Sequence, residues 1–435
     1  MTVVSLHEGG KDRNATPGQG VIASLDIGSS KICCMIAEVV AGNRRSTDLR
    51  AKLRILGVGY TASRGVHAGA IASVVEAEKA IRLAVDAAEK QANRSIFDVH
   101  VGVTGGYPQS LCRSGTATVI GSVVSNRDID AAVAAALEKT EIGSRAILHL
   151  APVSYGLDGV HSVSPPLGMH GKQLSVELGV VTVESSFLRN ITMAVERAHL
   201  NPCGFVMAPY ASAHCALVND EMKLGTVLVE LGSALTSVGY FNGGHLVAAD
   251  SIHLGGERIT NDIALGLNTN LVHAERLKTL HGSVVQSVHD DDEMLAVPML
   301  GEGEVQYVSK SILTAIIRPR AEEIIEHVRN LLMTEPFALG RTVRVVFAGG
   351  GANLPGLREL ASGILGRHVR MASIPDFEGL PDLARQSAFS VPTGLVCYGL
   401  SPDKQYALPR QAVAAIERQQ MGYVRRVGRW LADSF

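Results

Sequence analysis

The sequence contains no apolar run long enough to cross a membrane, because nothing approaches about 18 uninterrupted apolar residues. The N-terminus also lacks the apolar stretch of a signal peptide. Charge is nearly balanced, with 40 basic and 42 acidic residues, so no basic excess indicates nucleic-acid binding. Six cysteines include no C-x-x-C pair, and 15 histidines show no ligand spacing, so neither a zinc site nor a disulfide framework is indicated. We therefore expect reduced thiols in a chain that is neither secreted nor membrane-spanning, with no nucleic-acid partner.

The sequence does contain enough apolar residues for a sizeable core. Hydrophobic residues make up 46% of the chain and charged residues 19%, an ordinary globular balance. A length of 435 residues suggests two to three domains. Short apolar strands alternate with amphipathic helical patterns, such as the one over residues 71–88, which predicts an α/β fold.

A turn near the N-terminus carries the first candidate site. Residues 21–40 consist of two apolar strands around a short polar turn, which predicts a β-hairpin with an acid, Asp26, at its tip. The residues that follow the acid in this turn are Gly28, Ser29, Ser30 and Lys31. Glycine and short side chains let backbone N–H groups cradle phosphate oxygens, and the carboxylate can hold hydrated Mg²⁺. Alone, the same pattern also fits an ordinary hairpin turn.

The acidic turn occurs a second time, at Glu230, Gly232 and Ser233, again ahead of an alternating strand. A third turn, between an apolar strand and a helical pattern, contains Gly349, Gly350, Gly351 and Asn353. Two acidic hairpin tips and a later glycine turn predict a nucleotide held between two similar lobes. The three motifs in this order resemble those of the actin, Hsp70 and sugar-kinase superfamily. The resemblance implies an α/β, actin-like two-lobed fold.

The pattern of predicted elements changes between about 104 and 178, where short strands surround one predicted helix. This pattern predicts a small α+β module inserted into the first lobe. The expected divisions, in chain order, are a flexible leader (1–20), lobe 1 (21–103 and 179–208, completed by 376–400), the inserted module (104–178), lobe 2 (209–375, with a subdomain at 266–332), a linker (401–421) and a terminal helix (422–435).

The terminal segment has the pattern of an amphipathic helix. At about 100° per residue, one arc, interrupted only by Ser434, collects the apolar side chains. These are Tyr423, Val424, Val427, Trp430, Leu431 and Phe435. The arginines on the opposite face or flank are Arg425, Arg426 and Arg429. A basic amphipathic helix behind a linker suits a membrane interface, while a helix docked on its own protein is the alternative.

Further segments narrow the resemblance to the bacterial cell-division family FtsA. They are residues 55–59, 149–158, 194–197, 255–264, 274–278 and 393–395. With the amphipathic tail, the resemblance covers about 21–400 and the last dozen residues. It implies an ATP-binding adaptor that self-associates into filaments and tethers FtsZ polymers. It also implies a place on the cytoplasmic face of the inner membrane at the division septum, among other divisome proteins.

The resemblance also implies roles for single residues. Asp26 would face the water shell of Mg²⁺, with the residues from Ser29 to Lys31 along the phosphates of ATP. The glycine turn and Asn353 would bracket the adenosine. Glu275 and Lys278 would flank the ribose and adenine, although an exposed i,i+3 ion pair is the alternative. The glycine turn on the nucleotide side of lobe 2 would consist of Gly255, Gly256 and Arg258.

Two departures from the superfamily pattern predict weak catalysis. Relatives usually have an Asp and then a glycine-rich loop ending in Thr, whereas this chain has Glu230 and a loop ending in Ala234 and Leu235. These side chains are expected to crowd the loop, and Leu235 offers no hydroxyl to phosphate. The stretch 207–210 also lacks the Glu or Gln that orients the attacking water in several relatives. We expect nucleotide binding, with very slow hydrolysis or none.

A proline-containing helical pattern provides the candidate partner site. Arg318, Arg320 and Glu323 match the region where FtsA-like proteins receive the C-terminal peptide of FtsZ, while a solvated helix face is the alternative. Two other functions stay open. One is a small-molecule kinase, for which no catalytic aspartate motif is found, and the other is a PilM-like adaptor of a pilus or secretion machine.

Overall fold

The structure is a computed structural model and describes residues 20–40, 52–138, 140, 142–162, 164–301, 304–337 and 342–400. Three expected segments therefore lie outside the described residues: the leader (except Gly20), the linker and the terminal helix. Within the described ranges, no helix combines the length and the apolar character that crossing a membrane requires.

The first lobe is built on a five-stranded sheet in the order β11-β6-β1-β2-β3. Its strands are β1 (Val21–Ile27), β2 (Lys31–Val39), β3 (Leu53–Ala62), β6 (Asp98–Val103) and β11 (Asn201–Met207). The predicted hairpin forms, because β1 and β2 pair antiparallel while β6 pairs parallel with β1. Two helices, α1 (Val74–Ala92) and α3 (Ser185–Arg197), belong to this lobe. The side chain of Ser73 caps α1, and Asn93 ends it in the left-handed conformation.

The second lobe repeats this arrangement, with a five-stranded sheet in the order β14-β13-β12-β17-β18. Its strands are β12 (Thr226–Leu231), β13 (Thr236–Asn242), β14 (His245–Ile252), β17 (Arg344–Ala348) and β18 (Val369–Met371). Its other elements are α5 (Asn219–Leu224), α6 (Gly256–Gly266), α7 (Leu271–His281), α8 (Lys310–Leu331), α9 (Leu357–Leu365) and the hairpin β15 (Met294–Pro298) and β16 (Val305–Ser309). Helix α8 runs through Pro319 without a break.

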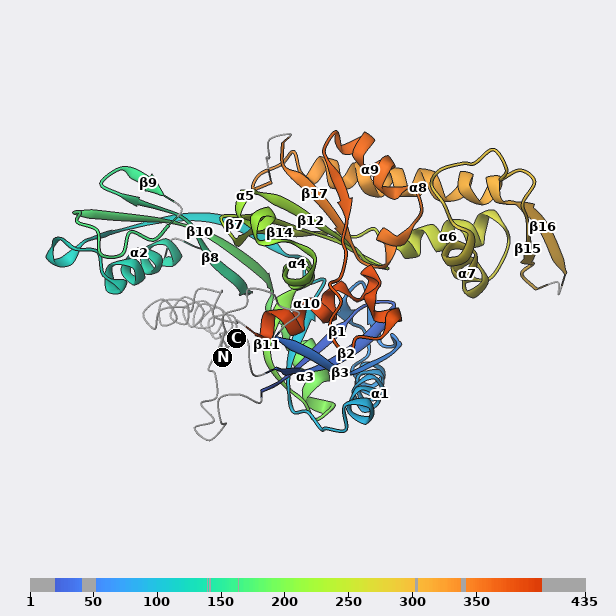
Figure 1. The fold of residues 1–435 in the computed structure, drawn as a ribbon, viewed down its shortest axis with the longest axis horizontal. Helices are drawn as coiled ribbons and strands as arrows, with labels where there is room; N and C mark the ends of the chain where they lie inside the picture. The colour runs from blue at the N-terminus through green and yellow to red at the C-terminus, as the bar shows by residue number, and fades with distance from the viewer. Residues whose placement is uncertain are drawn as a thin grey trace, which may run out of the picture.

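The inserted segment forms a separate four-stranded sheet in the order β7-β10-β8-β9. Its elements are β7 (Gln109–Thr118), α2 (Asn126–Glu138), β8 (Arg145–Leu157), β9 (Val160–Ser162) and β10 (Gln173–Glu184). Strand β10 continues past residue 178 and pairs with β8 up to Glu184, so the sheet extends beyond the expected end of the module. The insert and the part formed by α6, α7, β15 and β16 lie at opposite ends of the long axis (Figure 1).

Two short helices join the lobes. Helix α4 (Ala208–Ala216) and helix α10 (Ser390–Gly399) pack closely together. A Cβ atom on Gly394 would lie 1.9 Å from the carbonyl oxygen of Ala211, so only glycine permits this approach. Side chains from both sheets meet in the same apolar core, with Leu25 from β1 and Leu228 from β12 fully buried there. The lobes are therefore continuous in packing around α4 and α10.

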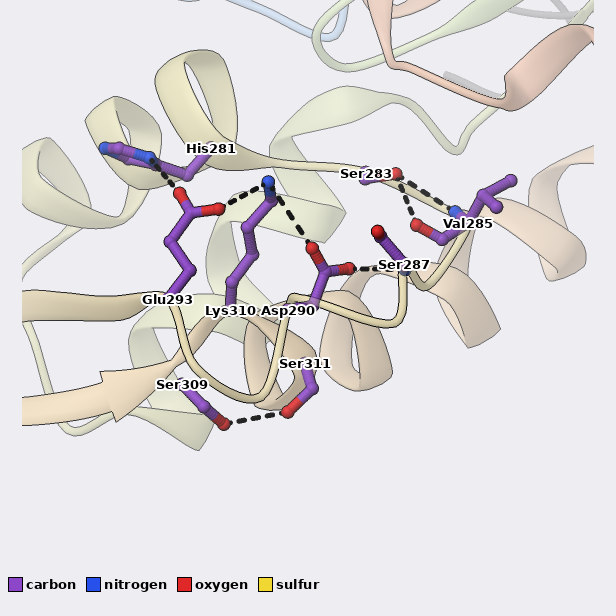
Figure 2. Close-up of polar contacts among 9 residues, drawn as sticks. All are labelled: His281, Ser283, Val285, Ser287, Asp290, Glu293, Ser309, Lys310 and Ser311. Carbon is purple, nitrogen blue, oxygen red and sulfur yellow. Dashed lines mark hydrogen bonds and ion pairs between the residues drawn. The ribbon is translucent and has the colours of Figure 1, made fainter.

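In the acidic stretch 290–293, the last three residues are exposed and only the first is buried. Asp290 is buried, and its carboxylate accepts a hydrogen bond of 2.7 Å from the backbone N–H of Ser287. The Lys310 ammonium lies 3.5 Å from the carboxylate of Asp290 and 2.9 Å from that of Glu293 (Figure 2). The carboxylate of Glu293 also lies 3.6 Å from the His281 ring. This cluster ties the loop to the start of α8.

Candidate functional site

The two acidic turns share an equivalent backbone hydrogen bond. The N–H of Gly28 donates to the carbonyl of Lys31 at 3.1 Å, and the N–H of Gly232 donates to the carbonyl of Leu235 at 2.9 Å. In each lobe the acid stands near the end of a central strand, beside a parallel neighbour. The hairpins therefore place Asp26 and Glu230 on the two sides of one cleft.

The cleft has a volume of about 720 Å³. The candidate nucleotide residues that line it are Asp26, Gly28, Ser29, Ser30, Lys31, Glu230, Gly232, Ser233, Gly256, Glu275, Lys278, Gly350, Gly351 and Asn353. Three other candidates do not line it: Gly255, Arg258 and Gly349. The sequence reasoning did not identify Thr104, Thr260 and Ala388, which also line the cleft. Nothing in their local sequence distinguishes them, because distant chain segments bring them there.

Asp26 is the acid of the first lobe. Its side chain is buried, and burial raises the pKa of its carboxyl to about 6, although nearby Lys31 lowers it. A carboxylate oxygen is the ligand type that Mg²⁺ prefers, and a cation would favour the ionised form. The position at the floor of the cleft fits a carboxylate that contacts the water shell of a nucleotide-bound Mg²⁺.

Lys31 is held by protein groups. Its ammonium donates to the carbonyl of Ala388 and lies 3.7 Å from the ring centroid of Phe389. Burial lowers the pKa of this ammonium, while the negative potential of Asp26 raises it. The carbonyl and the ring replace part of the hydration that the ammonium loses. Lys31 thus lines the cleft but is bound to the turn that precedes α10.

Glu230 occupies the equivalent place in the second lobe, with different partners. The hydroxyl of Ser212 donates to its carboxyl at 2.6 Å, and the hydroxyl of Ser390 lies 3.0 Å from it. Ser390 has a single proton and also lies 2.8 Å from the carbonyl of Ser387. A protonated Glu230 resolves this conflict, because it donates to Ser390 while Ser390 donates to Ser387. Burial raises the pKa of Glu230 to about 8, consistent with a neutral side chain linking α4 and α10.

The turn after β17 leaves no room for side chains at two glycines. Gly349 has a φ of +89°, and a Cβ atom there would lie 2.5 Å from the carbonyl oxygen of Leu231. A Cβ atom on Gly351 would lie 1.6 Å from the side chain of Leu231. Gly350 and Asn353 face the cleft beside them. Gly349 therefore allows the turn to pack directly against the backbone of Leu231.

Helices α6 and α7 form the opposite wall. The Lys278 ammonium donates to Glu275 at 2.7 Å, to the hydroxyl of Thr260 at 2.8 Å and to the carbonyl of Gly256 at 3.0 Å. Glu275 and Lys278 thus form the i,i+3 ion pair that was the alternative to nucleotide contact, and both side chains line the cleft. Gly255 packs against the backbone of Ser233, where a Cβ atom would lie 2.4 Å from its carbonyl oxygen.

The altered second loop lines the cleft with Ala234 and Leu235. Leu235 is only 2% exposed, and its side chain approaches Gly69 and Gly105. A Cβ atom on either glycine would lie 3.3 or 3.5 Å from the Leu235 side chain. The leucine that replaces a hydroxyl residue therefore packs between the lobes. The start of α4 places Ala208 in the cleft, where a water-orienting side chain would be needed.

The candidate partner residues lie outside this cleft. Arg320 makes two hydrogen bonds to Asp262, at 2.6 and 3.1 Å, and also contacts Glu323. Arg318 pairs with Glu322 at 2.8 Å. Arg320 lines a second hollow of about 430 Å³. The other lining residues are Leu254, Arg258, Asn261, Asp262, Ala264, Leu265 and Leu271.

The paired sheets, the cleft between them and the three turns define an actin-like fold. Solved structures agree, because the PilM–PilN type IV pilus biogenesis complex matches with a TM-score of 0.61 and 18% identity, covering 87% of this chain and 98% of that chain. MreB5 of Spiroplasma citri bound to ADP matches with a TM-score of 0.52 and 14% identity, covering 88% and 97%.

Sequence relatives then identify the family. Residues 227–394 match the family "Cell division protein FtsA", and residues 105–182 match "SHS2 domain inserted in FTSA". The chain is 37% identical over 422 residues to the cell division protein FtsA of Agrobacterium fabrum, covering 95% of each. It is 25% identical to that of Escherichia coli K12, over 95% of this chain and 98% of the relative. The chain belongs to the FtsA family of cell-division proteins.

Proposed function

We propose that this protein is a nucleotide-binding adaptor that tethers FtsZ polymers to the inner membrane at the division septum. The observation that carries the proposal is the cleft between the two acidic turns, in a chain of the FtsA family. Family membership favours this function over the pilus adaptor and the kinase. Self-association into filaments and contacts with other divisome proteins belong to the same proposal.

ATP with Mg²⁺ is the ligand that best fits the cleft. Backbone N–H groups of the two hairpin turns would bind the phosphates, with Asp26 toward the Mg²⁺ water shell. The glycine turn with Asn353 would contact the adenosine, and Glu275 would accept from the ribose. Binding of a fluorescent ATP analogue should therefore depend on Mg²⁺ and weaken about tenfold or more in Asp26→Asn. Binding that ignores both Mg²⁺ and this substitution would contradict the assignment.

Hydrolysis is expected to be very slow or absent. Glu230 is hydrogen-bonded to two serines, and the start of α4 offers Ala208 where a base would stand. Turnover measured with the protein at saturating ATP should stay far below the range of about 1–10³ s⁻¹ typical of dedicated enzymes. A turnover inside that range would refute this part of the proposal.

The hollow beside α8 is the proposed site for the C-terminal peptide of FtsZ. Arg258 and Arg320 supply positive charge, and exposed Leu265 and Leu271 supply apolar surface. An acidic and apolar peptide would compete with Asp262 and Glu323 for the guanidinium of Arg320. We expect Arg320→Glu to weaken peptide binding about tenfold or more in fluorescence anisotropy. Arg329→Glu, on the same helix but outside the hollow, is the matched control.

The terminal segment 422–435 is the proposed membrane anchor. Six partly buried apolar side chains give a single helix only marginal affinity, which linkage through a filament can raise about 10²–10⁴-fold. Co-sedimentation with anionic liposomes, with and without ATP, should compare the full chain with one ending at Gln420. Loss of binding in the shortened chain, and stronger binding of the full chain with ATP, are the expected results. Binding that ignores the tail would contradict the anchor and favour a pilus-type adaptor.

A further inference from the structure

The short turn Ser387–Ser390, which leads into α10, contacts all three nucleotide motifs. The carbonyl of Ala388 accepts from Lys31 of the first hairpin. The hydroxyl of Ser390 binds Glu230 of the second hairpin. A Cβ atom on Gly350, in the glycine turn, would lie 3.7 Å from that of Ala388.

The contact to Lys31 is the one that a phosphate can take over. The ammonium is held by one carbonyl and by the face of Phe389, both of them neutral groups. A charged phosphate oxygen is a stronger acceptor than a carbonyl, and Lys31 lines the same cleft as the phosphate-side turns. A phosphate bound there therefore competes with the 387–390 turn for the ammonium.

The contact to Glu230 has no such competitor. Glu230 is bound through hydroxyl groups of Ser212 and Ser390, and a neutral carboxyl does not attract an anion. Release of Lys31 would thus remove one contact between the turn and the first lobe, while the packing of Phe389 on Tyr60 and the hydrogen bond of 2.9 Å from the Ser24 hydroxyl to the carbonyl of Pro392 remain. The buried hydroxyl of Ser387 has no hydrogen-bond partner among the described residues. A rearrangement of the turn that gave this hydroxyl a partner would be favourable.

We propose that the 387–390 turn senses the phosphates of the bound nucleotide through Lys31 and passes the change to α10. The inference rests on the proposed nucleotide binding. In this scheme Lys31 leaves Ala388 and Phe389 when phosphate binds, and the 387–390 turn loses its hydrogen bond to the first hairpin, while the hydroxyl of Ser24 still binds the carbonyl of Pro392 in the first turn of α10. Helix α10 is the last described element, and the sequence after it leads to the proposed membrane segment. The turn is therefore placed to link the cleft with the end of the chain that carries the anchor.

Phe389→Leu tests the competition, because it removes the aromatic face and keeps an apolar side chain. A phosphate would then displace Lys31 from the turn at a lower free-energy cost, so the Kd for a fluorescent ATP analogue with Mg²⁺ should fall about two- to fivefold. If Phe389 only stabilised the fold, its replacement would raise the Kd, because less of the protein would be folded and able to bind. Tyr60→Leu is the matched control, because Tyr60 packs edge-to-face on the same ring at 5.7 Å and leaves Lys31 in place. Its Kd should equal that of the wild type.

Hydrogen exchange of the peptides covering 387–399 tests the transmission. In the wild type and in Tyr60→Leu, ATP with Mg²⁺ should speed exchange at the start of α10. Phe389→Leu should show this faster exchange without nucleotide, with little further change when ATP is added. Tight ATP binding that leaves the exchange of 387–399 unaltered would overturn the inference, as would a Kd in folded Phe389→Leu that is unchanged or raised. Absence of ATP binding in all three proteins would instead remove the nucleotide proposal itself, and this inference with it.

Discussion

Two neighbouring glycines after β17 have very different surroundings. A Cβ atom on Gly349 would lie 2.5 Å from the carbonyl oxygen of Leu231 and 2.9 Å from the carboxyl of Glu230, at a φ of +89°. On Gly350 the nearest atom would be 3.7 Å away, an ordinary contact. Gly349→Ala should therefore lower the free energy of unfolding by about 2–4 kcal/mol, whereas Gly350→Ala should change it by less than about 1 kcal/mol. Urea unfolding of the two variants measures the difference, and equal effects would contradict the expectation.

The neutral Glu230 predicts a pH dependence of stability. Its pKa is about 8 in the folded protein and 4.5 when unperturbed, so the unfolded chain ionises first as pH rises. Between these values ionisation favours the unfolded state, by at most about 1.4 kcal/mol per pH unit, and the effect levels off above pH 8. Glu230→Gln keeps a neutral group that can both donate and accept, and it lacks this loss. Relative to the wild type, the variant should therefore gain stability from pH 5.5 to pH 8.5.

Urea unfolding at these two pH values measures the effect of Glu230→Gln. Other titrating groups, Asp26 included, are present in both proteins and largely cancel from the difference. Ser212→Ala is a useful comparison, because it removes one hydroxyl partner and should destabilise the protein at pH 5.5 as well. An equal loss of stability in Glu230→Gln at both pH values would show that Glu230 is ionised in the folded protein.

At the scale of elements, the cluster around Lys310 predicts that one side chain holds a loop in place. The loop carries buried Asp290, and its next residues pair with the backbone of β16 and α8, where the N–H of Lys310 donates to the carbonyl of Glu293 at 2.9 Å. Lys310→Met would leave the buried carboxylate without its cation, which is destabilising. We expect a lower unfolding midpoint and faster hydrogen exchange in 282–293. Lys79→Met, which removes an exposed pair with Glu76, should change neither.

The sequence allowed prediction of elements whose pattern is local. Both acidic hairpins and the helix α2 follow from the alternation of apolar residues and from turn chemistry, within a few residues. The contact between Lys31 and Ala388 was not predictable in this way, because the two residues are far apart in the chain and the acceptor is a backbone carbonyl. Acidic runs are usually solvated, but Asp290 is buried, and a single lysine from another element compensates its burial. Sequence patterns thus locate the turns that form the cleft, whereas the hydrogen-bond and ion-pair partners of its side chains depend on tertiary contacts.

At the scale of the whole molecule, the strands of the second lobe belong to two cores. Along β12, Leu228 faces the core shared with the first lobe, while Val227 and Val229 face the core under α6, α8 and α9. The insert has a third core of its own, around α2 and the strands β8 and β10. The lobes should therefore unfold together, while the distal part of the insert can open separately.

A matched pair of leucines tests this division. Leu228 in β12 and Leu174 in β10 are both 0% exposed, but they belong to the shared core and to the core of the insert. Leu228→Ala should lower the stability of the main unfolding transition by about 2–5 kcal/mol, because it leaves a cavity where the lobes meet. Leu174→Ala should leave that transition nearly unchanged and speed hydrogen exchange in 109–178 alone. If Leu174→Ala lowered the main transition as much as Leu228→Ala, the insert would be part of the same cooperative unit. Any rearrangement of the insert would then also disturb the nucleotide cleft.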